Sequence, residues 1–193
     1  MTLTIWTAPG MLFHNAPSNV VWCESDVGTV AGRRAARPEE RVASHAVLHG
    51  ARAADSIEKS VVRHLDAGPY AVVTLGPIVA RKYDVGGHMA AHVDGKDGAT
   101  QRAMLVMIPH GDYDGGRLVA EGVAVGPPVR HDTTTCVLIM HGTVHEVTKV
   151  TRGTRYVYTC PVFVDDMGPA ASEFGPGENF KMPPGSDAGG FFN

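Results

Sequence analysis

The chain has 193 residues, of which 44% are hydrophobic and 19% are charged. This length and balance are typical of a soluble globular protein and predict a single domain spanning residues 1–193, with enough chain for a sizeable core. The net charge of −3 gives no overall reason to expect a nucleic-acid partner, although a local basic groove would not change this sum.

The three cysteines, Cys23, Cys136 and Cys160, are widely spaced and form no CxxC motif. Their odd number argues against a disulfide framework, so we expect reduced, mostly buried thiols and a cytoplasmic location. The first residues lack the basic segment and long apolar run of a signal peptide. No apolar stretch approaches the length of a membrane span, so we expect no membrane association.

The N-terminal part, residues 1–69, predicts short strands followed by helices that pack on one sheet. TLTIW and NVVWC have strand character and are separated by turn signals. Residues 36–68 predict helix with one break near Gly50 and an end at Gly68. Apolar residues recur at helical spacing in the second half of this segment: Ile57, Val61, Val62 and Leu65.

Residues 70–166 predict the core of a mainly β fold, because short runs rich in Val, Ile, Thr and Tyr alternate with Gly, Pro and Asp clusters. The runs are AVVTLGPIVARKY, RAMLVMIP, GRLVAEGVAV, TTCVLIMHG and TRYVYTCPVFV. No helix-length pattern separates them, which favours antiparallel strands in a sandwich or barrel over βαβ units. The remaining tail, residues 167–193, is rich in Gly and Pro and is expected to be irregular.

The stretch GGHMAAHVDG, residues 86–95, places two histidines and an aspartate close together. A helical zinc site of the HExxH type needs a glutamate after His88, where this chain has Met89, and the neighbouring glycines disfavour a helix. In a strand, His92 and Asp94 share a face about 6.5–7 Å apart, whereas His88 and His92 share a face about 13 Å apart. Strand geometry therefore favours His92 with Asp94 as a metal-binding pair and leaves His88 as a neighbour.

One further histidine would complete two histidines and a carboxylate, the facial triad that leaves open coordination positions on Fe(II). The available histidines are His88, His110, His131, His141 and His145. His145 begins HEVTKVTRGTRYVYT, which leads into a β-rich run, and His141 precedes it by four residues. One of these two is expected to face inward, and their spacing leaves the choice between them open.

Several further features occur in a fixed order around this stretch. They are Tyr83, Gly86 and Gly87, the HVD motif, DGGRL at 114–118, and then His145, Val147, Val150, Gly153 and Arg155. Tyr83 precedes His92 by nine residues, and Arg155 follows His145 by ten. With this ordered set, residues 82–163 resemble the Fe(II)/2-oxoglutarate-dependent dioxygenase superfamily, and most of all its prolyl-4-hydroxylase-like branch.

The resemblance implies a double-stranded β-helix, a jelly-roll or cupin-like barrel, in which His92, Asp94 and His145 are the catalytic iron ligands. Arg155 would bind the distal carboxylate of 2-oxoglutarate, which its planar guanidinium suits. Tyr83 would position this co-substrate or line the pocket. The resemblance also implies Fe(II), 2-oxoglutarate and O2, with ascorbate as a candidate stimulant.

The implied reaction converts 2-oxoglutarate to succinate and carbon dioxide and removes hydrogen from a second substrate. Because Asp94 supplies a carboxylate that halogenating relatives lack, we expect hydroxylation or a related C–H oxidation. The expected substrate is a small molecule, an amino acid or a peptide-like chain. His88 and Arg102 are candidate substrate contacts.

Three positions depart from the pattern of the branch. Lys149 replaces a proline between two valines, Val157 replaces a serine found in some branches, and Met89 replaces an aromatic residue. These departures leave the second contact to the 2-oxoglutarate carboxylate and the pocket lining undetermined, while the metal set stays intact.

Two alternative functions remain open at this point. One is a base-oxidising dioxygenase acting on methylated nucleic acid, for which the chain offers no strongly basic stretch. The other is a cupin-like metal-binding protein without oxygenase activity. Neither the identity of the substrate nor the oligomeric state follows from the sequence.

Overall fold

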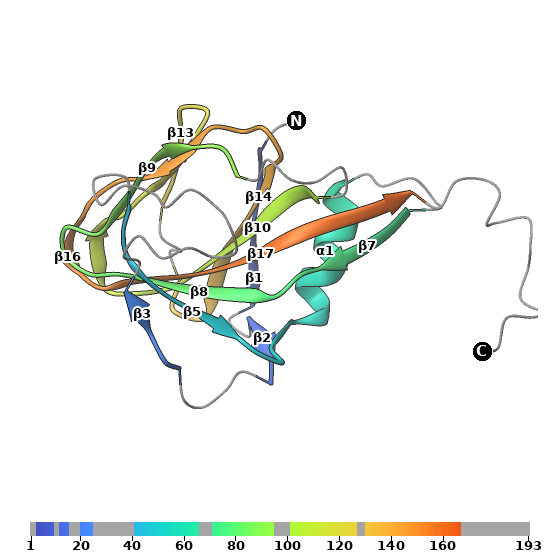
Figure 1. The fold of residues 1–193 in the computed structure, drawn as a ribbon, viewed down its shortest axis with the longest axis horizontal. Helices are drawn as coiled ribbons and strands as arrows, with labels where there is room; N and C mark the ends of the chain where they lie inside the picture. Colours follow the sequence, from blue (N-terminus) through green and yellow to red (C-terminus); the bar gives the residue numbers. More distant parts are fainter. Residues whose placement is uncertain are drawn as a thin grey trace, which may run out of the picture.

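The computed structural model describes residues 3–9, 12–15, 20–24, 41–65, 71–94, 101–126 and 130–166. Within these ranges the chain is mostly β-strand, with one α-helix (Figure 1). The elements up to the helix are β1 (Leu3–Pro9), β2 (Phe13–His14), β3 (Cys23–Glu24), β4 (Arg41–Val42), β5 (Ser44–Leu48), β6 (Arg52–Ala53) and α1 (Asp55–Leu65). The strands after it are β7 (Ala71–Leu75), β8 (Ile78–Tyr83), β9 (His88–His92), β10 (Gln101–Pro109), β11 (Tyr113–Gly115), β12 (Leu118–Ala120), β13 (Val123–Val125), β14 (Thr133–Met140), β15 (His145–Val147), β16 (Val150–Gly153) and β17 (Arg155–Asp166).

Two antiparallel sheets contain most of these strands. The large sheet has the order β1-β14-β10-β17-β8-β5-β3, with β7 also paired to β17, and the small sheet has the order β13-β12-β15-β9-β4. Two short pairs, β2 with β6 and β11 with β16, are separate from both sheets. In the described part of the chain neither sheet closes on itself. The arrangement is compatible with a β-sandwich or jelly roll.

The large sheet has a hydrophobic core on each face, because alternate residues of its strands point to opposite sides. In β14, Cys136 and Leu138 belong to the core shared with α1, whereas Val137 and Ile139 belong to the core shared with the small sheet. In Figure 1, α1 lies near β7, β10 and β17, and β9 lies toward the opposite end of the molecule.

The second half of the segment predicted as helix is confirmed as α1. Acidic residues in its first turn and basic residues in its last turn complement the helix dipole. Ile57 and Val61, four residues apart, are fully buried. Val62, although expected in the same apolar stripe, is 49% exposed. Gly68, predicted to end the helix, lies outside the described residues.

The helix predicted for the first half of this segment is wrong where the structure describes it. Residues 41–48 form β4, which pairs with β9 of the small sheet, and β5, which pairs with β8 of the large sheet. Ala46 and Leu48 are buried while Val47 between them is exposed, which is strand periodicity. The edges of two sheets supply pairing partners that outweigh the high helix propensity of the Ala and Arg residues in this segment. The expected N-terminal helices are thus corrected to one helix, α1, in the described chain.

The five runs predicted as strands after residue 70 all contain strands. In chain order they hold β7 and β8, then β10, then β12 and β13, then β14, and finally β17. Gly86 and Gly87 form the expected bend between β8 and β9: residues 85–86 form a turn, and Gly86 has a φ of 86°, which favours glycine. The Gly/Pro-rich tail, residues 167–193, lies outside the described residues.

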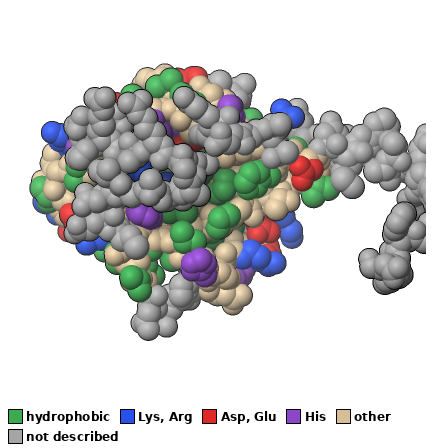
Figure 2. All heavy atoms as spheres, viewed as in Figure 1, with side chains coloured by type: hydrophobic (Ala, Val, Ile, Leu, Met, Phe, Trp, Pro, Cys, Tyr) green, Lys and Arg blue, Asp and Glu red, His purple; other side chains and the backbone are tan. Residues whose placement is uncertain are grey.

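The surface of the described residues is mixed in charge. Figure 2 shows Lys and Arg side chains interspersed with Asp and Glu on the visible face. In the described ranges, α1 is too short and too polar for a membrane-spanning helix. Cys136 and Cys160 are buried and free of disulfides, as expected; the side chain of Cys23 lies outside the described set.

Candidate metal centre

Three predicted ligands meet at one point between the two sheets. The ligand atoms of His92, Asp94 and His145 all lie within 4.8 Å of one another. The two carboxylate oxygens of Asp94 each face one imidazole: Oδ1 lies 3.4 Å from Nε2 of His92, and Oδ2 lies 3.4 Å from Nε2 of His145. Two ligand atoms at right angles and about 2.1 Å from a metal lie about 3 Å apart. The three residues therefore fit a single metal ion.

The pairing of β9 with β15 brings together two histidines that are 53 residues apart in the sequence. His92 is the register partner of His145, and their ring centroids are 4.2 Å apart. Asp94 follows two residues after His92, just past the end of β9. Of the two histidines that spacing left open, His145 is buried at the centre, and His141 is exposed in the turn after β14.

An irregularity in the β9–β15 pairing changes which residues of β9 face inward. Met89 pairs with Val147, and His92 pairs with His145. The two β9 residues are three positions apart and their β15 partners only two, so β9 contains one extra residue, a β-bulge. Both Met89 and His92 line the cavity beside the triad. The expectation that His88 and His92 share a face is therefore wrong, because the bulge reverses the alternation between them.

A backbone carbonyl orients each histidine. Nδ1 of His92 lies 3.0 Å from the carbonyl oxygen of Ala90, and Nδ1 of His145 lies 3.1 Å from that of Thr143. A carbonyl accepts, so each Nδ1 carries the hydrogen and each Nε2 keeps its lone pair. This is the orientation in which metal-bound histidines are usually held.

The protonation states of the triad also suit metal binding. Burial lowers the pKa of His145, an effect only partly opposed by the charge of Asp94 and the hydrogen bond to Thr143, so the ring favours its neutral form. Burial raises the pKa of Asp94, but the neighbouring side chains of His92, His145 and Arg81 together hold it below the usual value. The donor set is thus one carboxylate and two imidazoles.

Arg155 and Tyr83 lie in the same cavity, as register partners on β17 and β8. Both side chains are 1% exposed, and the guanidinium carbon of Arg155 lies 5.3 Å from the centroid of the Tyr83 ring. In the part of the chain that the structure describes, the buried Nε and Nη1 atoms of Arg155 have no hydrogen-bond partner. A buried arginine with free donors is a ready site for a carboxylate.

A second arginine close to Arg155 in the sequence, Arg152, has a different role. It lies exposed on β16 and binds two carboxylates, with Nη2 at 2.7 Å from Asp112 Oδ1 and Nε at 2.6 Å from Asp114 Oδ2. Its donors are therefore satisfied at the surface. The structure thus places Arg155 in the cavity and Arg152 outside it.

Neither candidate substrate contact lines the triad cavity. Met89 faces inward, so the preceding His88 lies on the opposite face of β9, with Nδ1 3.0 Å from the carbonyl oxygen of Gly86. Arg102 is exposed at the start of β10, two residues before Met104, which does line the cavity.

Among the charged residues that line the cavity, Arg81 was not predicted from the sequence. Arg81 of β8 lies two residues before Tyr83, pairs with Val157 of β17, and lines the cavity together with the triad. The signal was available, because residues two apart on a strand share a face. Once Tyr83 was placed in the pocket, Arg81 belonged there too.

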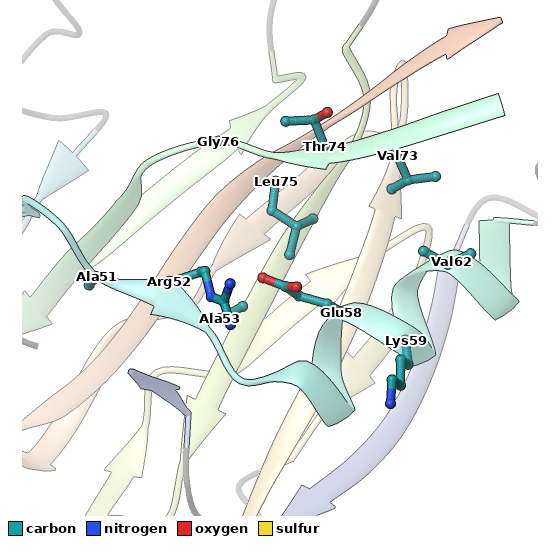
Figure 3. Close-up of a pocket in the computed structure, with 10 residues that line it drawn as sticks. All are labelled: Ala51, Arg52, Ala53, Glu58, Lys59, Val62, Val73, Thr74, Leu75 and Gly76. Carbon is teal, nitrogen blue, oxygen red and sulfur yellow. The ribbon is translucent and has the colours of Figure 1, made fainter. Parts of the chain in front are cut away.

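A second, larger hollow lies on the other face of the large sheet. It has a volume of about 530 Å³ and is bounded by the ends of β6 and β7 and by α1. Figure 3 shows the Glu58 carboxylate pointing toward Leu75 while Lys59 points away from β7. Leu75 packs against the core shared with α1, so this hollow is separated from the metal centre by the sheet.

No family model matches the chain, and no curated protein matches it. Solved structures match the chain in fold. A viral collagen prolyl hydroxylase from Paramecium Bursaria Chlorella virus-1, in a 2-oxoglutarate complex, aligns with a TM-score of 0.50 and 16% identity over 65% of this chain and 81% of its own.

A second similar structure is a prolyl hydroxylase from Trichoplax adhaerens in complex with a peptide fragment of the hypoxia inducible factor oxygen degradation domain. It aligns with a TM-score of 0.51 and 17% identity over 75% of this chain and 72% of its own. At these identities the likeness concerns the fold. This chain therefore shares the fold of the prolyl hydroxylases.

Proposed function

We propose that the chain is an Fe(II)- and 2-oxoglutarate-dependent oxygenase. It hydroxylates, or otherwise oxidises a C–H bond of, a small-molecule, amino-acid or peptide-like substrate and releases succinate and carbon dioxide. The observation that carries this proposal is the meeting of His92, Asp94 and His145 in a cavity that also holds the buried, unpaired Arg155. The first group supplies a facial metal site, and the second supplies a carboxylate site.

His92, Asp94 and His145 would hold the iron. Two histidines and one carboxylate leave coordination positions for other molecules, as Fe(II) oxygenases require. When bound, the iron supplies the oxidative chemistry that uses O2 and 2-oxoglutarate. The protein contributes by keeping both Nε2 atoms unprotonated through the carbonyls of Ala90 and Thr143 and by keeping Asp94 ionised.

Arg155 would bind the distal carboxylate of 2-oxoglutarate. Its free Nε and Nη1 atoms offer two donors in a planar fork, which matches a carboxylate. Tyr83 fixes one face of the guanidinium. Met104, Val106 and Leu118 add apolar walls to this cavity, and such walls exclude water and strengthen the ion pair.

The two sheets would form the double-stranded β-helix of a single domain, with its core in residues 70–166. A peptide-like substrate is supported by the similar prolyl hydroxylase whose structure contains a peptide fragment.

The test is to supply the purified chain with Fe(II), ascorbate, O2 and 2-oxoglutarate and to measure succinate. We expect succinate above background, and without O2 we expect a visible charge-transfer absorbance that needs both iron and 2-oxoglutarate. Tightly bound zinc, with no effect of 2-oxoglutarate on the protein, would instead support a cupin-like binding protein and overturn the proposal.

A pair of arginine variants provides the matched control. Arg155→Gln should lower the affinity for 2-oxoglutarate by about tenfold or more, because a charged hydrogen-bond donor is lost. Arg155→Lys should restore part of it. Arg152→Gln removes an equal charge from the surface and should leave the affinity unchanged. Equal losses in Arg152→Gln and Arg155→Gln would refute the assigned role of Arg155.

A further inference from the structure

A group of basic side chains lies beside the metal centre and has no part in the proposed function. We call Arg41, His45 and Arg81 the cationic cluster. His45 of β5 is the register partner of Arg81 of β8, so both face the same side of the large sheet. Arg81 lines the cavity of the triad, which fixes that side as the one facing the small sheet.

Arg41 joins the cluster from the small sheet. It is the register partner of Met89, and Met89 lines the triad cavity. Arg41 and His45 are four residues apart, on β4 and β5, at the point where the chain passes from the small sheet to the large one. The crossing therefore places one basic residue on each sheet at the same edge of the cavity.

Three polar atoms of the cluster have no hydrogen-bond partner among the described residues. Nε of Arg41, Nδ1 of His45 and Nε of Arg81 are all buried without a hydrogen bond. Among the described residues, neither arginine forms an ion pair. Buried donors that have no partner are rare in native proteins because each one is costly, and they commonly mark a ligand site.

The three side chains also repel one another. Burial and the charge of Arg81 lower the pKa of Arg41, and burial together with the charges of Arg81 and Arg41 lowers the pKa of His45. The charge of Asp94 acts on the pKa of Arg41 in the opposite sense. A metal ion on Asp94 would take up that counter-charge.

The charge balance of the loaded site points to a missing anion. The negative charges of Asp94 and of the 2-oxoglutarate dianion would be balanced by the charges of a divalent iron and of Arg155. Arg41 and Arg81 then leave two positive charges that no described carboxylate compensates. Buried charges are normally paired, so the ligand that enters last should bring negative charge.

We propose that Arg41 and Arg81, assisted by His45, bind a carboxylate of the primary substrate. The inference rests on the proposed function and deepens it, since it identifies the substrate as a molecule or peptide that carries a carboxylate group. The guanidinium of Arg81 suits a carboxylate through its planar fork. Because Arg81 shares its cavity with His92, Asp94 and His145, a C–H bond near that carboxylate would lie close to the metal.

The test uses Mn(II) in place of iron, so that binding is measured without turnover. The chain is first titrated with 2-oxoglutarate by calorimetry in the presence of Mn(II). The loaded protein is then titrated with free amino acids and their amides, and with capped peptides that contain Asp or Glu and their Asn or Gln counterparts. The free acids test a small-molecule source of the carboxylate, and the capped peptides test a side-chain source.

We expect at least one acid to bind about tenfold more tightly than its amide, the size expected for a charged hydrogen bond. Arg81→Gln should abolish this preference and should lower 2-oxoglutarate affinity much less than Arg155→Gln does, and Arg81→Lys should keep part of the preference. Lys82→Gln is the matched control, because Lys82 is the next residue on β8 and binds Asp84 at 2.9 Å instead.

Two results would overturn the inference. One is equal binding of acids and amides throughout the panel. The other is a loss of 2-oxoglutarate affinity in Arg81→Gln as large as that in Arg155→Gln, which would place Arg81 in the co-substrate site. Failure of the proposed function is seen separately, as absent metal-dependent binding of 2-oxoglutarate in the first titration.

Discussion

Arg155 depends on the absence of a side chain at Gly116. A Cβ atom built on Gly116 would lie 2.8 Å from Cδ of Arg155 and 2.8 Å from Cγ2 of Val150. The glycine also has a φ of 57°, a conformation that costs other residues about 1–2 kcal/mol. The second glycine of the DGGRL motif therefore serves the site directly, by leaving room for the buried guanidinium.

Gly116→Ala should reduce both stability and 2-oxoglutarate affinity, because the added methyl group displaces Arg155. Gly122→Ala is the matched control: Gly122 also has a positive φ, of 77°, but nothing lies within 4 Å of its Cβ position. We expect both variants to lose about 1–2 kcal/mol of stability from the backbone. Gly116→Ala alone should also bind 2-oxoglutarate about tenfold more weakly.

Calorimetry and denaturant unfolding of the two variants measure these effects. Equal 2-oxoglutarate affinities in Gly116→Ala and Gly122→Ala would show that Arg155 does not need the space that Gly116 leaves.

At the level of single residues, the sequence predicted the meeting of the triad well. Strand periodicity selected His92 with Asp94, and the resemblance then selected His145 over His141. His88 could not be placed correctly, because a bulge needs knowledge of the partner strand. Arg41 and His45 were missed for a related reason: their strands were predicted as helix, so their common direction was hidden.

The elements of the fold are divided by the large sheet into a layer that forms the site and a layer that supports it. Ile57 and Val61 of α1 are fully buried against the face opposite the metal centre. The helix therefore contributes packing energy without touching the cavity. Its effect on stability should be separable from any effect on ligand binding.

Ile57→Ala should lower the free energy of unfolding by about 2–5 kcal/mol, the usual cost of such a truncation in a core. Val62→Ala is the control on the same helix, and because Val62 is half exposed its effect should stay within about 0.5 kcal/mol. Urea unfolding of both variants measures the difference. A similar loss in the two variants would mean that α1 is held by a different face from the one described.

The helix α1 was predictable because its apolar spacing is local to the segment. The strands at residues 41–48 were not predictable, because the composition of this segment allows a helix. The segment forms strands because β9 and β8 offer backbone hydrogen-bond partners. Tertiary pairing of this kind lies outside the reach of local propensity. The strands after residue 70 were predictable because β-branched runs and turn signals agreed with each other.

At the scale of the whole molecule, the site is divided between the two sheets. His92 and His145 belong to strands of the small sheet, and Arg155 and Tyr83 belong to the large one. A 2-oxoglutarate molecule held by the metal and by Arg155 would tie the sheets together. Ligands that bind only the folded state raise its stability, by about 2.7 kcal/mol at a hundredfold excess over the dissociation constant.

Thermal unfolding should therefore show an ordered response. Mn(II) should raise the melting temperature, and 2-oxoglutarate should raise it further only when the metal is present, because its two ends need both the metal and Arg155. Asp94→Ala should lose both increments, whereas Arg155→Gln should keep the first and lose the second. Stabilisation of Asp94→Ala by 2-oxoglutarate equal to that of the unaltered chain would contradict a site shared between the sheets, since the ligand would then be held by the large sheet alone.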